Sequence, residues 1–481
     1  MLAVWAFRGA LAYGFAQDDF AALARAAGLL PRFTEPWRWL SLQGFFDLLR
    51  PLAGLDPLPY RLAMLAGHGL ATALVYRLLS RFTAPPAALA GAVFFGVHPA
   101  SFTAVYWIST VGDLFALVFA LRAMEWAARG RALPAALGFA LSLLCKESLV
   151  LLPAVLAGWR ALDRARGPEH ARPPIFDRSL AAMTLIAAAY LIYFVVANGL
   201  HATPAPGAEP YAIRAGRHVL ENAASYLGWT ANPWMPTVRG FTDAVDPAVY
   251  GWGLGLAALW LAGAFVPALR ARGWLHAAVL YAGFIAPVLP LERHTYHYYL
   301  YGALAGAALA VAAALDAAEA WLTGGSAAAR GGRRRSAAAL HWSLALLVAL
   351  AFAANGSLMV RKIETMPFGH PELRAEPIVD RARIATNVRA ALVNAPLPEG
   401  ATLLFYSPEA RAMAPDAASG RETYWERNVR SALYDGVAVR LFAPNVREVR
   451  FVTAPVPGDS LWYALYGVTG RTQVVRADAL R

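Results

Sequence analysis

The chain has 481 residues, of which 58% are hydrophobic and only 15% are charged, and its mean hydropathy is +0.43. A water-soluble protein of this length needs far more charge to cover its surface, so the composition excludes an ordinary soluble enzyme and indicates an integral membrane protein. The net charge of +12 comes mainly from arginines in short loops between apolar runs, which is typical of membrane topology and argues against nucleic-acid binding. With one cysteine, Cys145, the chain has no internal disulfide.

Apolar runs predict about eleven transmembrane helices. The first, Leu2 to Ala16, leads into an outer loop, residues 17–59, in which residues 37–50 have the amphipathic pattern of a helix on the membrane surface. A second outer loop, residues 198–248, carries a helical pattern at 214–229. Arginines follow nearly every inward run, and they predict the orientation of the helices because positive loops lie on the cytoplasmic side. The other expected spans are residues 60–79, 87–97, 113–128, 133–144, 149–162, 180–197, 249–269, 274–289, 296–321 and 340–354.

The pattern changes after residue 355. Charge, proline and alternating apolar residues predict a small α/β domain outside the membrane, residues 356–481, following an α-helical polytopic domain, residues 1–355. It has no nucleophile elbow, phosphate loop or metal-ligand spacing, so we expect it to assist binding or packing. Its expected elements are a helix at 378–393 and strands at 402–406, 437–442, 449–453 and 461–466.

Two adjacent carboxylates, Asp18 and Asp19, follow the first apolar run directly. At the membrane surface such a pair can serve as an acid/base site, or it can simply stop the helix from sinking into lipid. Neighbouring residues of a regular helix cannot both point at one spot. One is therefore expected to be the general base and the other to orient it, with Asp19 slightly favoured because it lies further outside.

Further ionisable and aromatic residues fall on the same outer side. Ionisable groups near a membrane are rare and usually pair or line a cavity, so this gathering predicts a pocket. Lys146, Arg293 and Arg50 are expected to bind a phosphate. The alternatives are a helix cap at His98, an ion pair Lys146–Glu147, and membrane-interface tyrosines. The expected pocket residues are His98, Tyr106, Trp107, Asp113, Glu147, Glu292, His294 and Tyr296.

The order of these pieces resembles the GT-C glycosyltransferases that use polyprenyl-phosphate sugars, and within them the relatives of protein O-mannosyltransferases. The resemblance covers about residues 10–310. One departure is that Ser109 to Gly112 lacks the arginine that the family often has before the acidic residue, here Asp113, which puts a phosphate contact in doubt. The matching pieces are Asp18-Asp19, Arg50-Pro51, His98-Pro99, Trp107-Ile108-Ser109, Asp113-Leu114, Leu143 to Glu147 and Pro290 to Tyr301.

The resemblance implies an inverting transfer, of hexosyl or mannosyl type, from a polyprenyl-phosphate sugar to a hydroxyl or amine of a protein, glycan or lipid. The site would face the outside of a bacterial inner membrane, with a first-loop Asp as base. Family members differ in metal need. A divalent ion is compatible with Asp18, Asp19, His98 and Glu147, but their spacing defines no metal site.

Two rival functions stay open. Charges gathered at one face, and no internal repeat, argue against a transporter or lipid flippase. The missing arginine is the one feature that favours a non-catalytic envelope scaffold.

Overall fold

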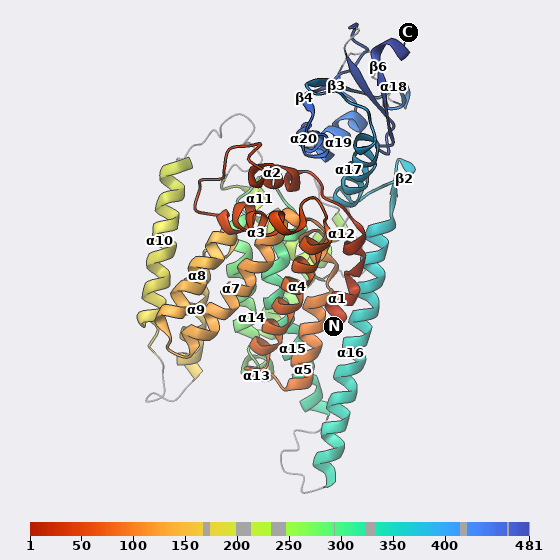
Figure 1. The fold of residues 1–481 in the computed structure, drawn as a ribbon. Helices are drawn as coiled ribbons and strands as arrows, with labels where there is room; N and C mark the ends of the chain where they lie inside the picture. The colour runs from red at the N-terminus through yellow and green to blue at the C-terminus, as the bar shows by residue number, and fades with distance from the viewer. Residues whose placement is uncertain are drawn as a thin grey trace.

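The computed structural model describes residues 1–166, 174–198, 213–231, 247–292, 294–322, 332–413, 421–458 and 461–480. A bundle of long helices carries a smaller mixed domain of helices and strands at one end (Figure 1). We call the end of the bundle that carries this domain the domain end, and the opposite end the far end.

Most of the apolar runs form bundle helices, and several begin or end within a few residues of the expected bounds. Proline stands at the first position of α5, where its missing N–H costs no helical hydrogen bond. The longer helices are α4 (Leu58–Leu79), α5 (Pro85–Val97), α7 (Val111–Ala128), α8 (Ala132–Cys145), α9 (Leu152–Arg166), α10 (Arg178–Asn198), α11 (Arg217–Ala231), α12 (Pro247–Gly263), α14 (Trp274–Ile285), α15 (Leu300–Leu322) and α16 (Gly332–Thr365).

Short helical pieces connect them, mostly at the domain end. These are α1 (Leu2–Ala6), η1 (Arg8–Ala12), α2 (Asp18–Ala26), η2 (Leu40–Gly44), α3 (Phe45–Ala53), η3 (Pro99–Ser101), α6 (Phe102–Tyr106), η4 (Ile108–Thr110), η5 (Glu147–Leu149), α13 (Pro267–Ala271), η8 (Ala286–Val288) and η9 (His297–Tyr299).

Within the described residues, 4 helices are long and apolar enough to cross a membrane, or 5 if the pair bent by 45° at Pro99 counts as one span. The expected number of about eleven is therefore not reached. Helices α5, α8 and α14 have 13, 14 and 12 residues, fewer than the roughly 20 that a span needs. The described spans are Leu58–Leu79, Arg178–Val196, His297–Leu322 and Ala338–Thr365.

The expectation of one continuous first helix is wrong. The chain forms α1, then the 3-10 helix η1, and then becomes extended at Tyr13. Gly9 explains the break, because a Cβ there would lie 2.6 Å from the Tyr106 hydroxyl and 2.7 Å from a Glu364 carboxylate oxygen. The close approach requires glycine, which also weakens a helix.

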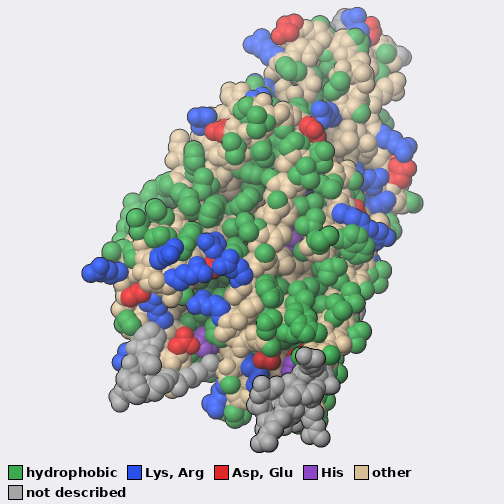
Figure 2. Space-filling view, turned by 60° about the horizontal axis from the view of Figure 1, so that its bottom comes forward, with side chains coloured by type: hydrophobic (Ala, Val, Ile, Leu, Met, Phe, Trp, Pro, Cys, Tyr) green, Lys and Arg blue, Asp and Glu red, His purple; other side chains and the backbone are tan. Residues whose placement is uncertain are grey.

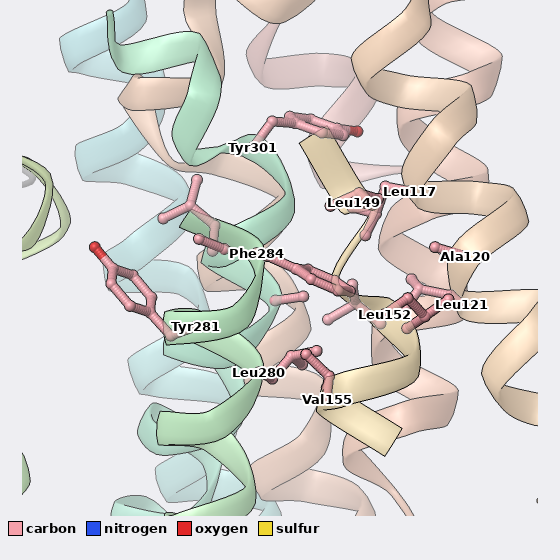
Figure 3. Close-up of a cluster of buried hydrophobic side chains, with 14 of the residues drawn as sticks. Leu117, Ala120, Leu121, Leu149, Leu152, Val155, Leu280, Tyr281, Phe284 and Tyr301 are labelled. Carbon is pink, nitrogen blue, oxygen red and sulfur yellow. The ribbon is translucent and has the colours of Figure 1, made fainter. Parts of the chain in front are cut away.

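The core of the bundle lies between α7, α9, α14 and α15 (Figure 3). Phe284 reaches from α14 toward Leu152 and Leu121, and all three side chains are at most 4% exposed. Helices α14 and α15 approach closely at Gly306, where a Cβ would lie 2.6 Å from the Tyr281 backbone nitrogen. Tight helix contact at small residues is typical of membrane bundles.

The mixed domain, residues 367–480, is called the C-terminal domain below. Its sheet has the order β4-β3-β5-β6, in which β3 pairs in parallel with β4 and β5, and β6 pairs antiparallel with β5. The elements are β1 (Pro367–Phe368), β2 (His370–Arg374), α17 (Pro377–Val393), β3 (Ala401–Tyr406), α18 (Pro408–Met413), α19 (Tyr424–Ala432), α20 (Val437–Phe442), β4 (Val446–Phe451), β5 (Trp462–Tyr466), β6 (Thr472–Arg476) and η11 (Ala477–Leu480).

The structure of this region differs from the sequence expectations in three places. Residues 437–442 form helix α20 and not a strand, since a short apolar run does not distinguish the two and Gly436, with φ 90°, starts a helix there. Strand β6 was not expected. Helix α16 runs through residue 355, so the change in composition falls inside a helix and the C-terminal domain begins after Thr365.

The C-terminal domain packs on the segment that follows η1. One hydrophobic cluster joins Phe15 and Phe20 to Val439 and other residues of the domain. The rings of Phe20 and Phe442 meet edge to face at 5.4 Å, and the Gln17 N–H donates to the Ala432 carbonyl at 3.2 Å. The domain therefore fixes the segment that carries Asp18 and Asp19.

Candidate functional site at the domain end

A cavity of about 170 Å³, called the domain-end cavity, lies where four distant segments meet. The start of α2, helix α6, the loop before α15 and the start of α17 each contribute to its wall. Carboxyl, imidazole, phenol and indole groups share this space, a combination suited to acid/base work on a polar ligand. The lining residues are Gln17, Asp18, Thr103, Trp107, His294, Tyr296, His297, Tyr298, Glu376, Pro377 and Ile378.

Asp18 is the first residue of α2 and faces this cavity. The preceding residue, Gln17, has φ 53°, which turns the chain sharply before the helix begins. The side chain is accessible, yet the surrounding protein removes enough water to raise the pKa of Asp18, while Arg25, Arg381 and Arg38 lower it. A raised pKa makes the carboxylate a stronger base.

Asp19 points the other way and is fully buried. Its Oδ1 accepts from the N–H and the hydroxyl of Ser109 at 2.7 and 2.6 Å, and its Oδ2 accepts from the Ala16 N–H at 3.0 Å. Burial raises its pKa to about 6. The sequence slightly favoured Asp19 as the base; in the structure its oxygens hold the loop, and Asp18 is the accessible member of the pair.

A second group of charges, called the Lys146 cluster, consists of Arg38, Asp113, Lys146 and Glu147. The Lys146 Nζ donates to Asp113 Oδ2 at 2.6 Å, and the Arg38 guanidinium contacts Glu147 through two nitrogens, one of them Nε at 2.7 Å. Each cation thus has its own carboxylate, and of the two cations Lys146 is buried whereas the Arg38 side chain is 32% exposed. The alternative pairing of Lys146 with Glu147 is replaced by these two crossed pairs.

Tyr298 connects the cluster to the cavity. Its ring lines the cavity and lies 4.8 Å from Lys146 Nζ, a cation–π distance. His294, also in the wall, has its pKa lowered to about 4 by burial and by the positive charges of Lys146 and Arg38. The positive charge of Lys146 therefore acts on the cavity although the Tyr298 ring lies between them. His294 is neutral at physiological pH.

Other expected residues lie elsewhere among the described residues. His98 Nδ1 accepts from the Ala100 N–H and caps η3, as the helix-cap alternative proposed. The Tyr106 ring stacks on Phe102 at 3.9 Å inside a hydrophobic cluster. Glu292 forms an ion pair with Arg214 at 2.8 Å.

Two of the three expected phosphate ligands remain to be placed. Arg50 lies in the last turn of α3 and is not part of the described lining of the cavity. Arg293 lies outside the described residues. In the described part of the chain, no three His, Cys, Asp or Glu residues are grouped so that they could hold a metal ion.

Several residues of the site were missed from the sequence, among them Tyr298, Arg38 and Glu376. Arg38 stands between Trp37 and Trp39, which suggested a helix at the membrane surface. Glu376 lies just before α17; it is 3% exposed, hydrogen-bonds to Thr103, and burial raises its pKa to about 7. The one local signal was a glutamate before a proline that starts a helix.

Known proteins give limited help with this site. The chain matches none of the protein-family models and none of the curated proteins. Among solved structures, the crystal structure of ArnT from Cupriavidus metallidurans bound to undecaprenyl phosphate is similar, with 13% identity and a TM-score of 0.48 over 93% of this chain and 87% of that chain. A likeness this weak carries no argument about the site.

Proposed function

We propose that the chain is a membrane glycosyltransferase that moves a sugar from a polyprenyl-phosphate donor to an acceptor hydroxyl or amine, with Asp18 as the general base. The observation that carries this proposal is that Asp18 shares one cavity with Tyr298, and Tyr298 contacts Lys146. An accessible carboxylate beside cations is what transfer from a phosphate-linked sugar requires. The same proposal includes the two features that the sequence suggested, a site on the outer face of the inner membrane and a sugar of mannosyl type.

In the proposed step, the acceptor's lone pair attacks the anomeric carbon of the donor sugar. The bond from that carbon to the phosphate oxygen breaks, and its electron pair leaves with the polyprenyl phosphate. The acceptor's proton passes to the Asp18 carboxylate, whose raised pKa favours this transfer. Asp19 acts as a positioning residue, because its bonds to Ser109 hold the start of α2.

Lys146 and Arg38 are the proposed phosphate ligands. An ammonium has three donors and a guanidinium five, so both can reach a phosphate while keeping their carboxylate partners. Asp113 and Glu147 fix the two cations in place before the donor arrives. The negative charge that develops on the leaving phosphate is then stabilised by these two cations.

The test compares Asp18→Asn with Asp56→Asn, a first-loop carboxylate outside the described cavity lining, in the full-length protein. Transfer of radiolabelled mannose from undecaprenyl-phosphate mannose to acceptors in the producing cell's membranes is measured, together with binding of undecaprenyl phosphate. We expect Asp18→Asn to lose transfer by about 100-fold or more while binding persists, and Asp56→Asn to match the wild type.

Lys146→Met supplies the complementary result, a loss of undecaprenyl-phosphate binding. Full transfer by Asp18→Asn rejects Asp18 as the base. Undiminished binding by Lys146→Met rejects the phosphate site. If the wild-type protein binds no undecaprenyl phosphate, the donor class itself is wrong.

A further inference from the structure

A groove of about 390 Å³ lies at the far end of the bundle, and we call it the far-end groove. Helix α4 ends there, α5 begins there at Pro85, and α7 ends there, whereas α7 starts near Asp113 at the domain end. The groove is therefore separated from the domain-end cavity by the length of these helices. Its described lining is Leu74, Tyr76, Arg77, Leu78, Ser80, Arg81, Pro85, Leu121, Glu125 and Arg129.

Arginines at this groove outnumber acids. The carboxylate of Glu125 forms ion pairs with Arg77, Arg122 and Arg129, the last at 2.6 Å. Arg81 is exposed, and no carboxylate of the described residues lies within ion-pair distance of it. In the described lining, three guanidiniums against one carboxylate leave a surplus of two positive charges, and Arg122 adds a third beside the groove, unlike the one-to-one pairs of the Lys146 cluster.

The guanidiniums remain open to a ligand although they touch Glu125. The side chains of Arg77 and Arg129 are 54% and 48% exposed, while that of Glu125 is 16% exposed. Each guanidinium has five N–H donors, and Glu125 uses only part of them. A planar guanidinium can donate two parallel hydrogen bonds to two oxygens of one phosphate. The groove thus offers several converging donors to an anion.

The floor of the groove is apolar. Leu74, Leu78 and Leu121 are between 4% and 6% exposed and belong to the bundle core. The view that brings the far end forward shows basic side chains gathered around acidic ones, with hydrophobic side chains beside them (Figure 2). Arg122 stacks over the Trp126 ring at 4.8 Å, an aromatic contact common where a membrane helix meets the headgroup region.

A cationic rim over an apolar floor fits a molecule that has a phosphate at one end and a hydrocarbon chain at the other. We propose that the far-end groove binds an anionic phospholipid, with its headgroup phosphate on Arg77, Arg81 and Arg129 and part of an acyl chain against Leu78 and Leu121. This site is independent of the glycosyltransferase proposal, because it uses no residue of the domain-end cavity. A free phosphate ion shares the headgroup chemistry but cannot use the apolar floor.

Native mass spectrometry of the full-length protein in detergent tests this, with phosphatidylglycerol, phosphatidylcholine and inorganic phosphate as probes. Arg81→Glu reverses the charge of the arginine that lacks a described carboxylate partner, so the ion pairs of Glu125 stay intact. Arg270→Glu is the matched control, since Arg270 is exposed on α13 and is not in the described lining. Each elementary charge near a headgroup changes binding by several-fold.

We expect the wild type to retain phosphatidylglycerol in preference to phosphatidylcholine. Arg81→Glu should weaken that binding by about tenfold, and Arg270→Glu should leave it unchanged. Equal losses in both variants, or equal retention of the two lipids, would show only general attraction to basic loops and overturn the proposal. Displacement of the lipid by millimolar inorganic phosphate would mark a free-anion site and overturn the lipid assignment.

Discussion

The two ends of the bundle hold their charges in opposite ways. At the domain end, Lys146 and Arg38 are each paired with one carboxylate, and Lys146 is almost completely enclosed. At the far end, Glu125 forms ion pairs with three arginines whose side chains are 54%, 30% and 48% exposed. Burial of Lys146 and Asp113 requires a matched pair, because an uncompensated charge inside a protein is very costly, whereas water around Arg77 and Arg129 tolerates a surplus. The domain end is therefore built for fixed geometry and the far end for attracting an anion.

The largest effect on stability should come from breaking a buried pair. Asp113→Asn leaves the Lys146 ammonium enclosed without a counter-charge and should lower the free energy of unfolding by about 3–5 kcal/mol. Thermal unfolding in detergent measures this. The double variant Asp113→Asn with Lys146→Met should recover much of the loss, and a single variant as stable as the wild type would mean that the pair is not buried in solution.

Glu376 should give the next largest effect, and one that depends on pH. Its pKa is raised from 4.5 to about 7, so the folded state binds the proton more tightly than the unfolded state. The stabilisation is complete below about pH 4.5 and is lost as the pH rises through 7, a change of at most about 3 kcal/mol. Glu376→Gln stays neutral, so it should match the wild type at pH 4.5 and melt at a higher temperature at pH 8. If the melting temperatures of Glu376→Gln and the wild type differ by the same amount at both pH values, the raised pKa of Glu376 is rejected.

Substitution of Asp18 and of Asp19 by Asn should change the free energy of unfolding by different amounts. Asp19→Asn disturbs hydrogen bonds from Ser109 and Ala16 and should cost about 1–3 kcal/mol of stability. Asp18→Asn should change stability by less than about 0.5 kcal/mol, because Asp18 is accessible in the cavity. Denaturation curves of the two variants, measured side by side, decide the matter; equal losses would contradict their different roles.

The smallest change in the free energy of unfolding is expected at the far end. Glu125→Gln removes a carboxylate whose partners are largely in water, so it should cost no more than about 1 kcal/mol, and less at high salt. The same variant should increase retention of phosphatidylglycerol, because it removes the only described acid from the groove lining. A loss as large as that of Asp113→Asn would erase the contrast between the two ends.

Much of the fold follows from sequence, because apolar runs mark helices directly. The run at 87–97 corresponds to α5, and the strand at 402–406 is confirmed as β3. The broken first helix could not be foreseen, since the cause is the close packing of Gly9 against Tyr106 and Glu364. Contacts of this kind join residues far apart in the chain and leave no local periodicity.

Sequence reasoning predicted only part of the candidate site. Asp18, Trp107, His294 and Tyr296 were assigned to one side from topology, and they do line one cavity. The choice between Asp18 and its neighbour depends on the position of Ser109, which no local pattern reveals. The contribution of Glu376 depends on how the C-terminal domain packs, which composition alone does not specify.

The hydrophobic cluster that joins Phe15 and Phe20 to Val439 has a consequence for biosynthesis. The ribosome makes these phenylalanines before the described bundle helices from α4 to α16, and makes their packing partners after them. Those helices are therefore synthesised before the segment around Asp18 can reach its final conformation. A chain released before the C-terminal domain is made would carry the bundle helices and still lack the packing partners of Phe15 and Phe20.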